Sequence, residues 1–134
     1  GDMSVLRMAL EAVAAVHNPA NVGALAQAGM FNISYRGHLI GSAATQPVQV
    51  PPMSSAVVRA HVRVDSVPTT AGLLMLQDIV NDIKNLPIQV DGSLWAVAGP
   101  FKVKCMVHCD LLTDVSALPE ARFSRKDCTY SYGV

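Results

Sequence analysis

The chain has 134 residues, of which 51% are hydrophobic and 15% are charged, and its ten basic and ten acidic residues cancel. This composition excludes a disordered chain, and the length predicts one domain, residues 1–134, in which Gly1-Asp2-Met3 resemble the remnant of a cleaved tag. The basic residues are scattered and no apolar run is long enough to cross a bilayer, so neither a nucleic-acid partner nor a membrane span is expected.

The first half of the chain predicts strands separated by turns. Apolar and polar side chains alternate in most of these segments, as they do in a strand with one buried face. Arg36-Gly37-His38 predicts a tight hairpin turn, and the prolines of residues 46–52 are typical of an edge strand. The predicted strands are residues 6–16, 30–36, 39–44, 46–52 and 55–64.

One long segment, residues 69–85, keeps a helical period instead. Thr69 or Thr70 is expected to cap its start, and the Leu86-Pro87 step is expected to stop it, because proline disfavours a helical residue before it. The apolar residues at three- and four-residue steps are predicted to pack against the sheet; they are Leu73, Leu76, Val80 and Ile83.

After the helix the chain again predicts strands, with turns at Asp91-Gly92 and Gly99-Pro100 and a loop over residues 111–120. The predicted strands are residues 88–90, 94–98, 101–110 and 122–132. The predicted fold is therefore mainly β, an antiparallel β-sandwich of about seven to eight strands with one inserted α-helix.

Five short motifs occur in a fixed order along nearly the whole chain. They are the Asn-Pro turn at Asn18-Pro19, the hairpin Tyr35-Arg36-Gly37, the strand from His61 to Ser66, the step Val90-Asp91-Gly92 and the strand from Lys102 to Val107. In this order the chain resembles the LEA2 domain, late embryogenesis abundant group 2, also called the water stress and hypersensitive response domain.

The resemblance implies an immunoglobulin- or fibronectin-III-like sandwich without enzymatic activity, catalytic residues or cofactor. It implies a domain associated with desiccation and other stress that acts by membrane, lipid or protein contacts. Two alternatives stand beside this function: a small-lipid binding or transfer module, and an extracellular adhesion-type interaction domain. An upstream anchor, frequent in the family, would place the domain on the extracytoplasmic side of a membrane; without one it would be cytoplasmic.

Three cysteines raise the question of a disulfide. Cys105 and Cys109 lie four residues apart on one predicted strand, about 13 Å from each other, so they cannot bond together and any bridge must use Cys128. The resemblance favours Cys105 with Cys128 as the first choice and Cys109 with Cys128 as the second. Three reduced thiols in a reducing compartment are the other interpretation.

No residue pattern predicts a metal site or a nucleophile. His108 points to the strand face opposite Cys105 and Cys109, and no Gly-x-Ser-x-Gly elbow is present. The remaining candidate is an apolar groove between helix and sandwich, for which ordinary core packing is the other interpretation. Its predicted lining is Val22, Leu25, Met30, Leu74, Met75 and Ile79.

Overall fold

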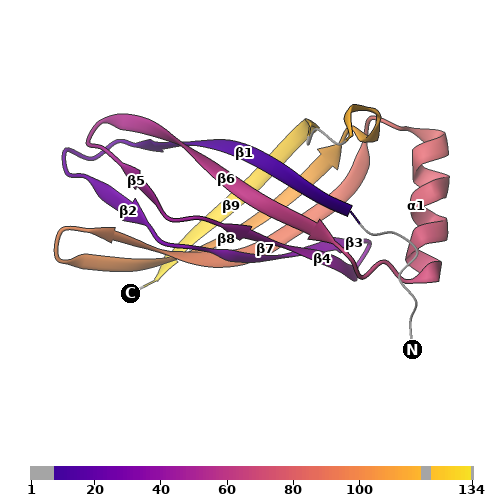
Figure 1. Ribbon diagram of the computed structural model, residues 1–134, viewed down its shortest axis with the longest axis horizontal. Helices are drawn as coiled ribbons and strands as arrows, with labels where there is room; N and C mark the ends of the chain where they lie inside the picture. The colour runs from indigo at the N-terminus through magenta and orange to yellow at the C-terminus, as the bar shows by residue number, and fades with distance from the viewer. Residues whose placement is uncertain (1–7, 119–121, 134) are drawn as a thin grey trace.

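The computed structural model describes residues 8–118 and 122–133, which contain nine strands and one α-helix (Figure 1). The helix is α1 (Thr69–Asn81), and a short 3-10 turn covers Val115–Ala117. The strands are β1 (Met8–Asn18), β2 (Ala24–Ala26), β3 (Met30–Tyr35), β4 (His38–Thr45), β5 (Val48–Val50), β6 (Ser54–Val64), β7 (Leu86–Ala98), β8 (Phe101–Thr113) and β9 (Phe123–Gly133).

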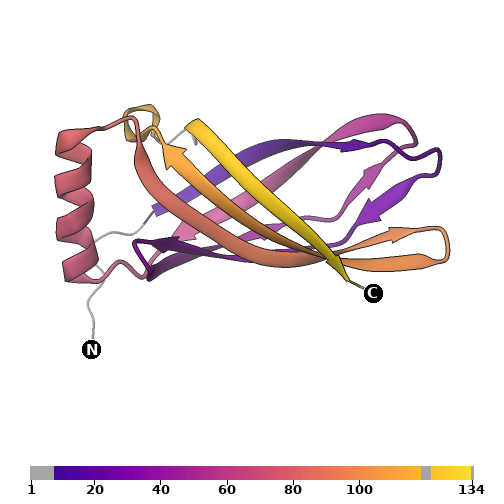
Figure 2. The same ribbon diagram turned by 180° about the vertical axis from the view of Figure 1, so that it is seen from behind.

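All the described strands belong to one antiparallel sheet. Its order is β1-β6-β4-β3-β7, and β8 and β9 continue beyond β7. The first part of β7 pairs with β3 and its last part with β2, which in turn pairs with β5. The sheet is curled, and α1 lies across one end of it (Figures 1 and 2). The prediction of a mainly β, antiparallel fold with one inserted helix is confirmed, whereas immunoglobulin-like connectivity stays a prediction.

The predicted hairpin before the helix is confirmed, and its geometry explains the glycine. Arg36 and Gly37 both have positive φ, 46° and 81°, the conformation that a two-residue hairpin turn needs. The proline-flanked strand β5 lies at an end of the sheet, as predicted for residues 46–52.

The predicted turn at Asp91-Gly92 is wrong, because β7 runs without interruption from Leu86 to Ala98. Gly92 pairs with Phe31 of β3, whose ring packs over the position that a side chain would take. A Cβ atom on Gly92 would lie 2.4 Å from Cδ1 of Phe31 and 2.3 Å from the carbonyl oxygen of Met30. This glycine therefore serves close strand packing rather than chain reversal.

The region after β8 also differs from the prediction. Residues 111–113, expected in a loop, extend β8 to Thr113. The carboxylate of Asp114 then accepts a hydrogen bond from the backbone N–H of Ser116 at 3.0 Å and caps the 3-10 turn. The end of the predicted loop, residues 119–120, lies outside the described residues.

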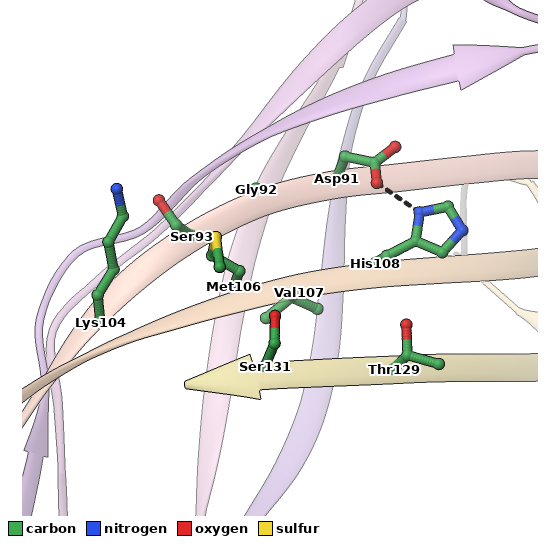
Figure 3. Close-up of a pocket in the computed structure, with 9 residues that line it drawn as sticks. All are labelled: Asp91, Gly92, Ser93, Lys104, Met106, Val107, His108, Thr129 and Ser131. Carbon is green, nitrogen blue, oxygen red and sulfur yellow. Dashed lines mark hydrogen bonds and ion pairs between the residues drawn. The ribbon is translucent and has the colours of Figure 1, made fainter. Parts of the chain in front are cut away.

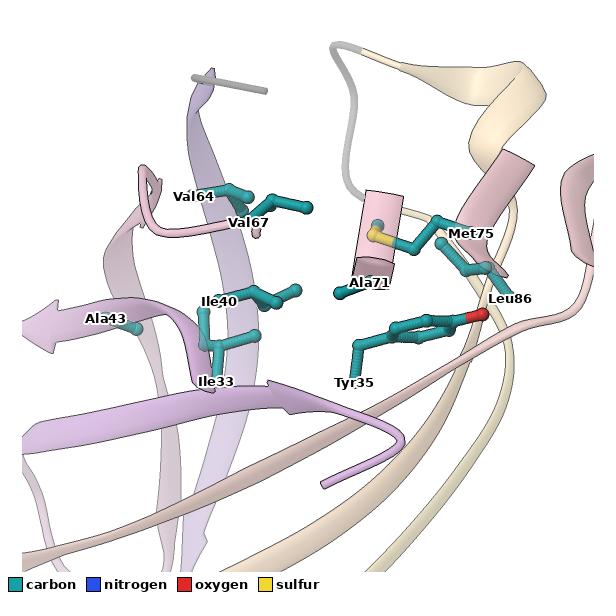
Figure 4. Packing of buried hydrophobic residues seen from close by; sticks show 9 residues of the cluster. All are labelled: Ile33, Tyr35, Ile40, Ala43, Val64, Val67, Ala71, Met75 and Leu86. Atoms are coloured by element: carbon teal, nitrogen blue, oxygen red, sulfur yellow. The ribbon is translucent and has the colours of Figure 1, made fainter. Parts of the chain in front are cut away.

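The buried core lies close to α1 rather than at the centre of the sheet. Figure 4 shows side chains of β3, β4, α1 and β7 converging on one another. The cluster consists of Ile33, Tyr35, Ile40, Ala43, Val64, Val67, Ala71, Met75 and Leu86. Val50 is the one other buried apolar residue in the part of the chain that the structure describes. The two ends of the molecule are therefore unequally packed.

Candidate functional surface

The inner side of α1 is held by two buried side chains. Ala71 and Met75 enter the core and lie near Tyr35 and Leu86 (Figure 4). Pro68 occupies the N-cap position and makes no side-chain cap, so neither Thr69 nor Thr70 caps the helix as predicted. Packing of this small inner stripe, rather than capping, keeps the helix on the end of the sheet.

A polar contact fixes the rotation of α1. The carboxylate of Asp78 accepts hydrogen bonds from the hydroxyl of Tyr35 and from the guanidinium of Arg36, with the Arg36 Nη2 to Asp78 Oδ1 distance at 2.9 Å. The Arg36 guanidinium holds the pKa of the Asp78 carboxyl below its ordinary value. Burial, helped by the adjacent carboxylate, raises the pKa of the Tyr35 phenol. Asp78 thus faces the sheet as a paired anion.

The outer side of α1 exposes large aliphatic side chains with the uncharged Gln77 among them, which reverses the predicted orientation. Leu73, Leu76 and Val80 keep 63%, 61% and 84% of their surface exposed, and Ile83 beyond the helix keeps 43%. We call Leu73, Leu76 and Val80 the outer stripe. The prediction that this stripe packs on the sheet is wrong, because the pairing of Asp78 with the hairpin turns the opposite side of the helix inward.

The outer stripe carries no charge. The sequence of α1 contains one ionisable residue, Asp78, and it points away from this side. The helix ends at Asn81 rather than near residue 85, because the carboxylate of Asp82 accepts bonds from the backbone N–H of Lys84 and the side-chain amide of Asn85. The next charged residues, Asp82 and Lys84, therefore lie beyond the helix.

The predicted apolar groove does not form. Val22 and Leu25 come from the β1–β2 connection and β2, at the end of the sheet far from α1 (Figure 1), and Met30 begins β3 opposite Ser93 in the middle of β7. Leu74, Met75 and Ile79 belong to the helix at the opposite end, where Met75 is buried and Ile79 packs against the core. The strands of the sheet therefore hold Val22 and Leu25 far from the apolar residues of the helix.

A second apolar surface lies on the inner face of the sheet, far from α1. Ala14 and Val16 share the face of Met8, which packs on the core, yet both are exposed. Across the curled sheet, on β9, Tyr130 and Tyr132 share the face of Cys128 and are also exposed. The sheet therefore buries its inner face near α1 and leaves it open at the far end.

The disulfide joins β8 to β9 on this inner face. Cys109 pairs with Cys128 in the strand register, and their sulfur atoms are bonded. Cys105 lies opposite Tyr132 and is a free thiol. Burial raises the pKa of this thiol. The first-choice pairing of Cys105 with Cys128 is wrong, and the second-choice pairing is the one the structure contains.

A shallow depression of about 360 Å³ lies on the outer face of β7, β8 and β9 (Figure 3). His108 hydrogen-bonds Asp91 through Nδ1, and its Nε2 lies 3.3 Å from Oδ2 of Asp110. Asp91 is the main reason that the pKa of His108 is raised above 6.5. Lys104 and several hydroxyl side chains complete the lining. Because alternate residues of a strand share a face, alternation along the strands was the sequence signal that could have predicted this grouping.

The described part of the chain has neither a metal cluster nor a membrane-spanning helix. Within residues 8–118 and 122–133, no group of three or more His, Cys, Asp or Glu side chains is arranged to hold a metal ion. No helix among these residues is both long enough and apolar enough to span a membrane.

Comparison with known proteins identifies the family. The LEA2 family model, described as late embryogenesis abundant protein, matches residues 13–111, most of the chain, and this family is generally non-enzymatic. A solved structure described as a protein from Archaeoglobus fulgidus shares the fold, with a TM-score of 0.50 at 13% identity over 99% of this chain and 89% of that chain. No curated protein matches. The chain belongs to the LEA2 family and is a stress-associated domain of the LEA2 type.

Proposed function

We propose that this domain is not an enzyme and that it acts by binding membrane surfaces through the outer stripe of α1. The observation that carries the proposal is the exposure of Leu73, Leu76 and Val80 on a helix whose single charge is turned inward. Exposed aliphatic side chains that gather on one element mark a contact with something apolar.

The size and charge of the stripe favour a lipid surface over a protein partner. A helix of 13 residues is about 20 Å long and about 10 Å wide, so one side offers roughly 200 Å². A stable protein interface buries about 800 Å² on each partner. Aliphatic side chains without adjacent cations suit shallow insertion between lipid headgroups, and they do not need an anionic surface.

The experiment is flotation with vesicles of zwitterionic phosphatidylcholine. The wild-type protein is expected to float with the vesicles, to a similar extent at low and high salt, because the stripe is uncharged. The double variant Leu76→Ser and Val80→Ser should remain folded and stay at the bottom of the gradient, since both side chains are exposed. Circular dichroism checks the folding of the variant.

The matched control is Phe101→Ser at the opposite end of the sheet, where the ring is 70% exposed. This variant is expected to float like the wild type. Loss of flotation in Phe101→Ser but not in the helix variant would place the contact at the other end of the molecule. Absence of wild-type flotation, or unfolding of Leu76→Ser on its own, would also overturn the proposal.

A second candidate function is binding of a small lipid on the open part of the inner face. The supporting observation is that Ala14, Val16 and Tyr130 are exposed although they share the face that is buried near α1. Alanines on this face leave room that larger side chains would fill. An acyl chain of a free fatty acid matches this apolar lining.

Native mass spectrometry with palmitate tests the second candidate. Val58 points to the inner face opposite Ala14, whereas Val57 points to the outer face. Val58→Trp should fill the space and abolish the protein–palmitate complex, while Val57→Trp should retain it. Equal binding by both variants, or no complex with the wild type, would contradict a site on the inner face.

A further inference from the structure

The free edge of β1 is a surface that membrane binding does not use. β1 ends the strand order of the sheet and pairs along its whole length with β6, Met8 to Val64 through Asn18 to Ser54, without a bulge. In the part of the chain that the structure describes, no strand pairs with its other edge. Every second one of its eleven residues therefore directs its backbone N–H and C=O groups outward, an arrangement that natural proteins usually protect.

The other two edges of the sheet carry such protection, and β1 does not. β5 has three residues and lies between Pro47 and Pro51. β9 carries three consecutive exposed charges, Arg125, Lys126 and Asp127. In β1 the residues from Val13 to His17 are exposed on both faces, with neither proline nor lysine among them. A strand of this length with a single carboxylate, Glu11, is a template for pairing with another strand.

The sequence of β1 is suited to pairing with a second copy of itself. We propose that β1 pairs antiparallel with β1 of a second copy of this chain, in the register centred on Val13. Val13 is the midpoint of Met8–Asn18, so all eleven residues find a partner. In this register each inner-face residue of one copy lies opposite an inner-face residue of the other. The inner faces of the two copies are therefore on the same side of the joined sheet.

Charge is compatible with this register and disfavours a neighbouring one. With Val13 opposite Val13 of the second copy, Glu11 faces Ala15, and no two like charges are opposed. A register centred on Glu11 would place two carboxylates directly opposite each other, which is destabilising. Glu11 is also paired with Arg59 of its own chain, 2.6 Å from Oε1 to Nη1, and remains so in the joined sheet.

The test is sedimentation equilibrium of charge variants at the two-fold position. The wild type is expected to form a dimer, and Val13→Lys and Val13→Glu are each expected to raise the dimer dissociation constant about tenfold or more. An equimolar mixture of the two variants should restore the dimer, because lysine then faces glutamate. The control Val57→Lys changes a residue of matched exposure, 55% against 54%, on the neighbouring strand, and should dimerise like the wild type.

Several results would overturn this proposal. These are a wild type that is monomeric at every concentration, a Val13→Lys variant that still dimerises, a mixture that fails to recover, or a Val57→Lys variant that loses the dimer equally. Should the charged variants fail to fold, Val13→Cys in a Cys105→Ser background tests the same contact. Mild oxidation should link two copies through Cys at position 13, and failure to do so would count against the register. Vesicle flotation of Val13→Lys should match the wild type, so the two proposals can fail separately.

Discussion

Tyr35 shows how one side chain positions the helix on which the proposed membrane contact depends. Its ring is fully buried and its hydroxyl donates a hydrogen bond to Asp78. The sequence marks Tyr35 as part of a hairpin, but the partner lies 43 residues away, and no local pattern predicts that contact.

Removing the Tyr35 hydroxyl should loosen this end of the molecule. Tyr35→Phe keeps the ring in the core and deletes a hydrogen bond to a charged group, so we expect the free energy of unfolding to fall by about 1–2 kcal/mol. Urea denaturation measures the change. Tyr130→Phe, at an exposed ring, is the control and should leave stability unchanged. Equal stability of Tyr35→Phe and wild type would show that the hydroxyl contributes nothing.

His108 gives the molecule a pH-dependent contact on its outer face. The hydrogen bond with Asp91 raises the pKa of His108 above 6.5, so the contact stabilises the fold fully below that value and is lost as the pH rises through the raised pKa. Titration of the ring signals by nuclear magnetic resonance should show Asp91→Asn lowering the pKa of His108 more than Asp110→Asn does. The reverse order would mean that Asp110 is the dominant partner.

At the scale of the element, the position of α1 in the chain was predictable and its rotation was not. Apolar residues of α1 occur on almost every side of the helix, so spacing alone favours the larger leucines as the inner stripe. The structure instead buries Ala71 and Met75, because Asp78 pairs with a residue of the β3–β4 hairpin. A tertiary contact of this kind decides between two faces that the sequence leaves nearly equal.

The disulfide pairing, like the rotation of α1, depends on a contact between distant segments that spacing in the sequence does not decide. Spacing excludes a bond between Cys105 and Cys109 but leaves both of them as partners of Cys128. The choice depends on the register of β9 against β8, which places Cys109, not Cys105, opposite Cys128. Register is set by pairing along the whole strand and by the turn that precedes it.

Removing the disulfide should lower the free energy of unfolding more than removing the free thiol does. Cys109→Ser with Cys128→Ser removes a link across 19 residues of sequence, and we expect a loss of about 3 kcal/mol in the free energy of unfolding. Cys105→Ser is the matched control and should change stability little. Thermal denaturation under non-reducing conditions measures both. A larger loss from Cys105→Ser would contradict this pairing.

At the scale of the whole molecule, alternation predicts strands and their faces but not how far the sheet curls. The face shared by Phe101, Val103, Cys105, Val107 and Cys109 was predictable from period two, and the register of β7 with β8 confirms it. The off-centre core was not predictable. It arises because α1 closes one end of the sheet, while small residues such as Ala14 face an interior that no other element of residues 8–118 and 122–133 covers.

Because the packing is uneven, the free energy of local opening should differ along the paired strands β1 and β6. Every residue of β1 pairs with β6, but Met8 and Val64 lie against the core, whereas Val16 and Ala56 lie at the open end. Opening of a paired strand costs less where fewer apolar contacts are broken. Native-state hydrogen exchange should therefore show β1 amides bonded to β6 exchanging progressively faster from Met8 towards Val16. Uniform protection along β1 would mean that the open end is as well packed as the end that α1 covers, and it would remove the space proposed for a small lipid.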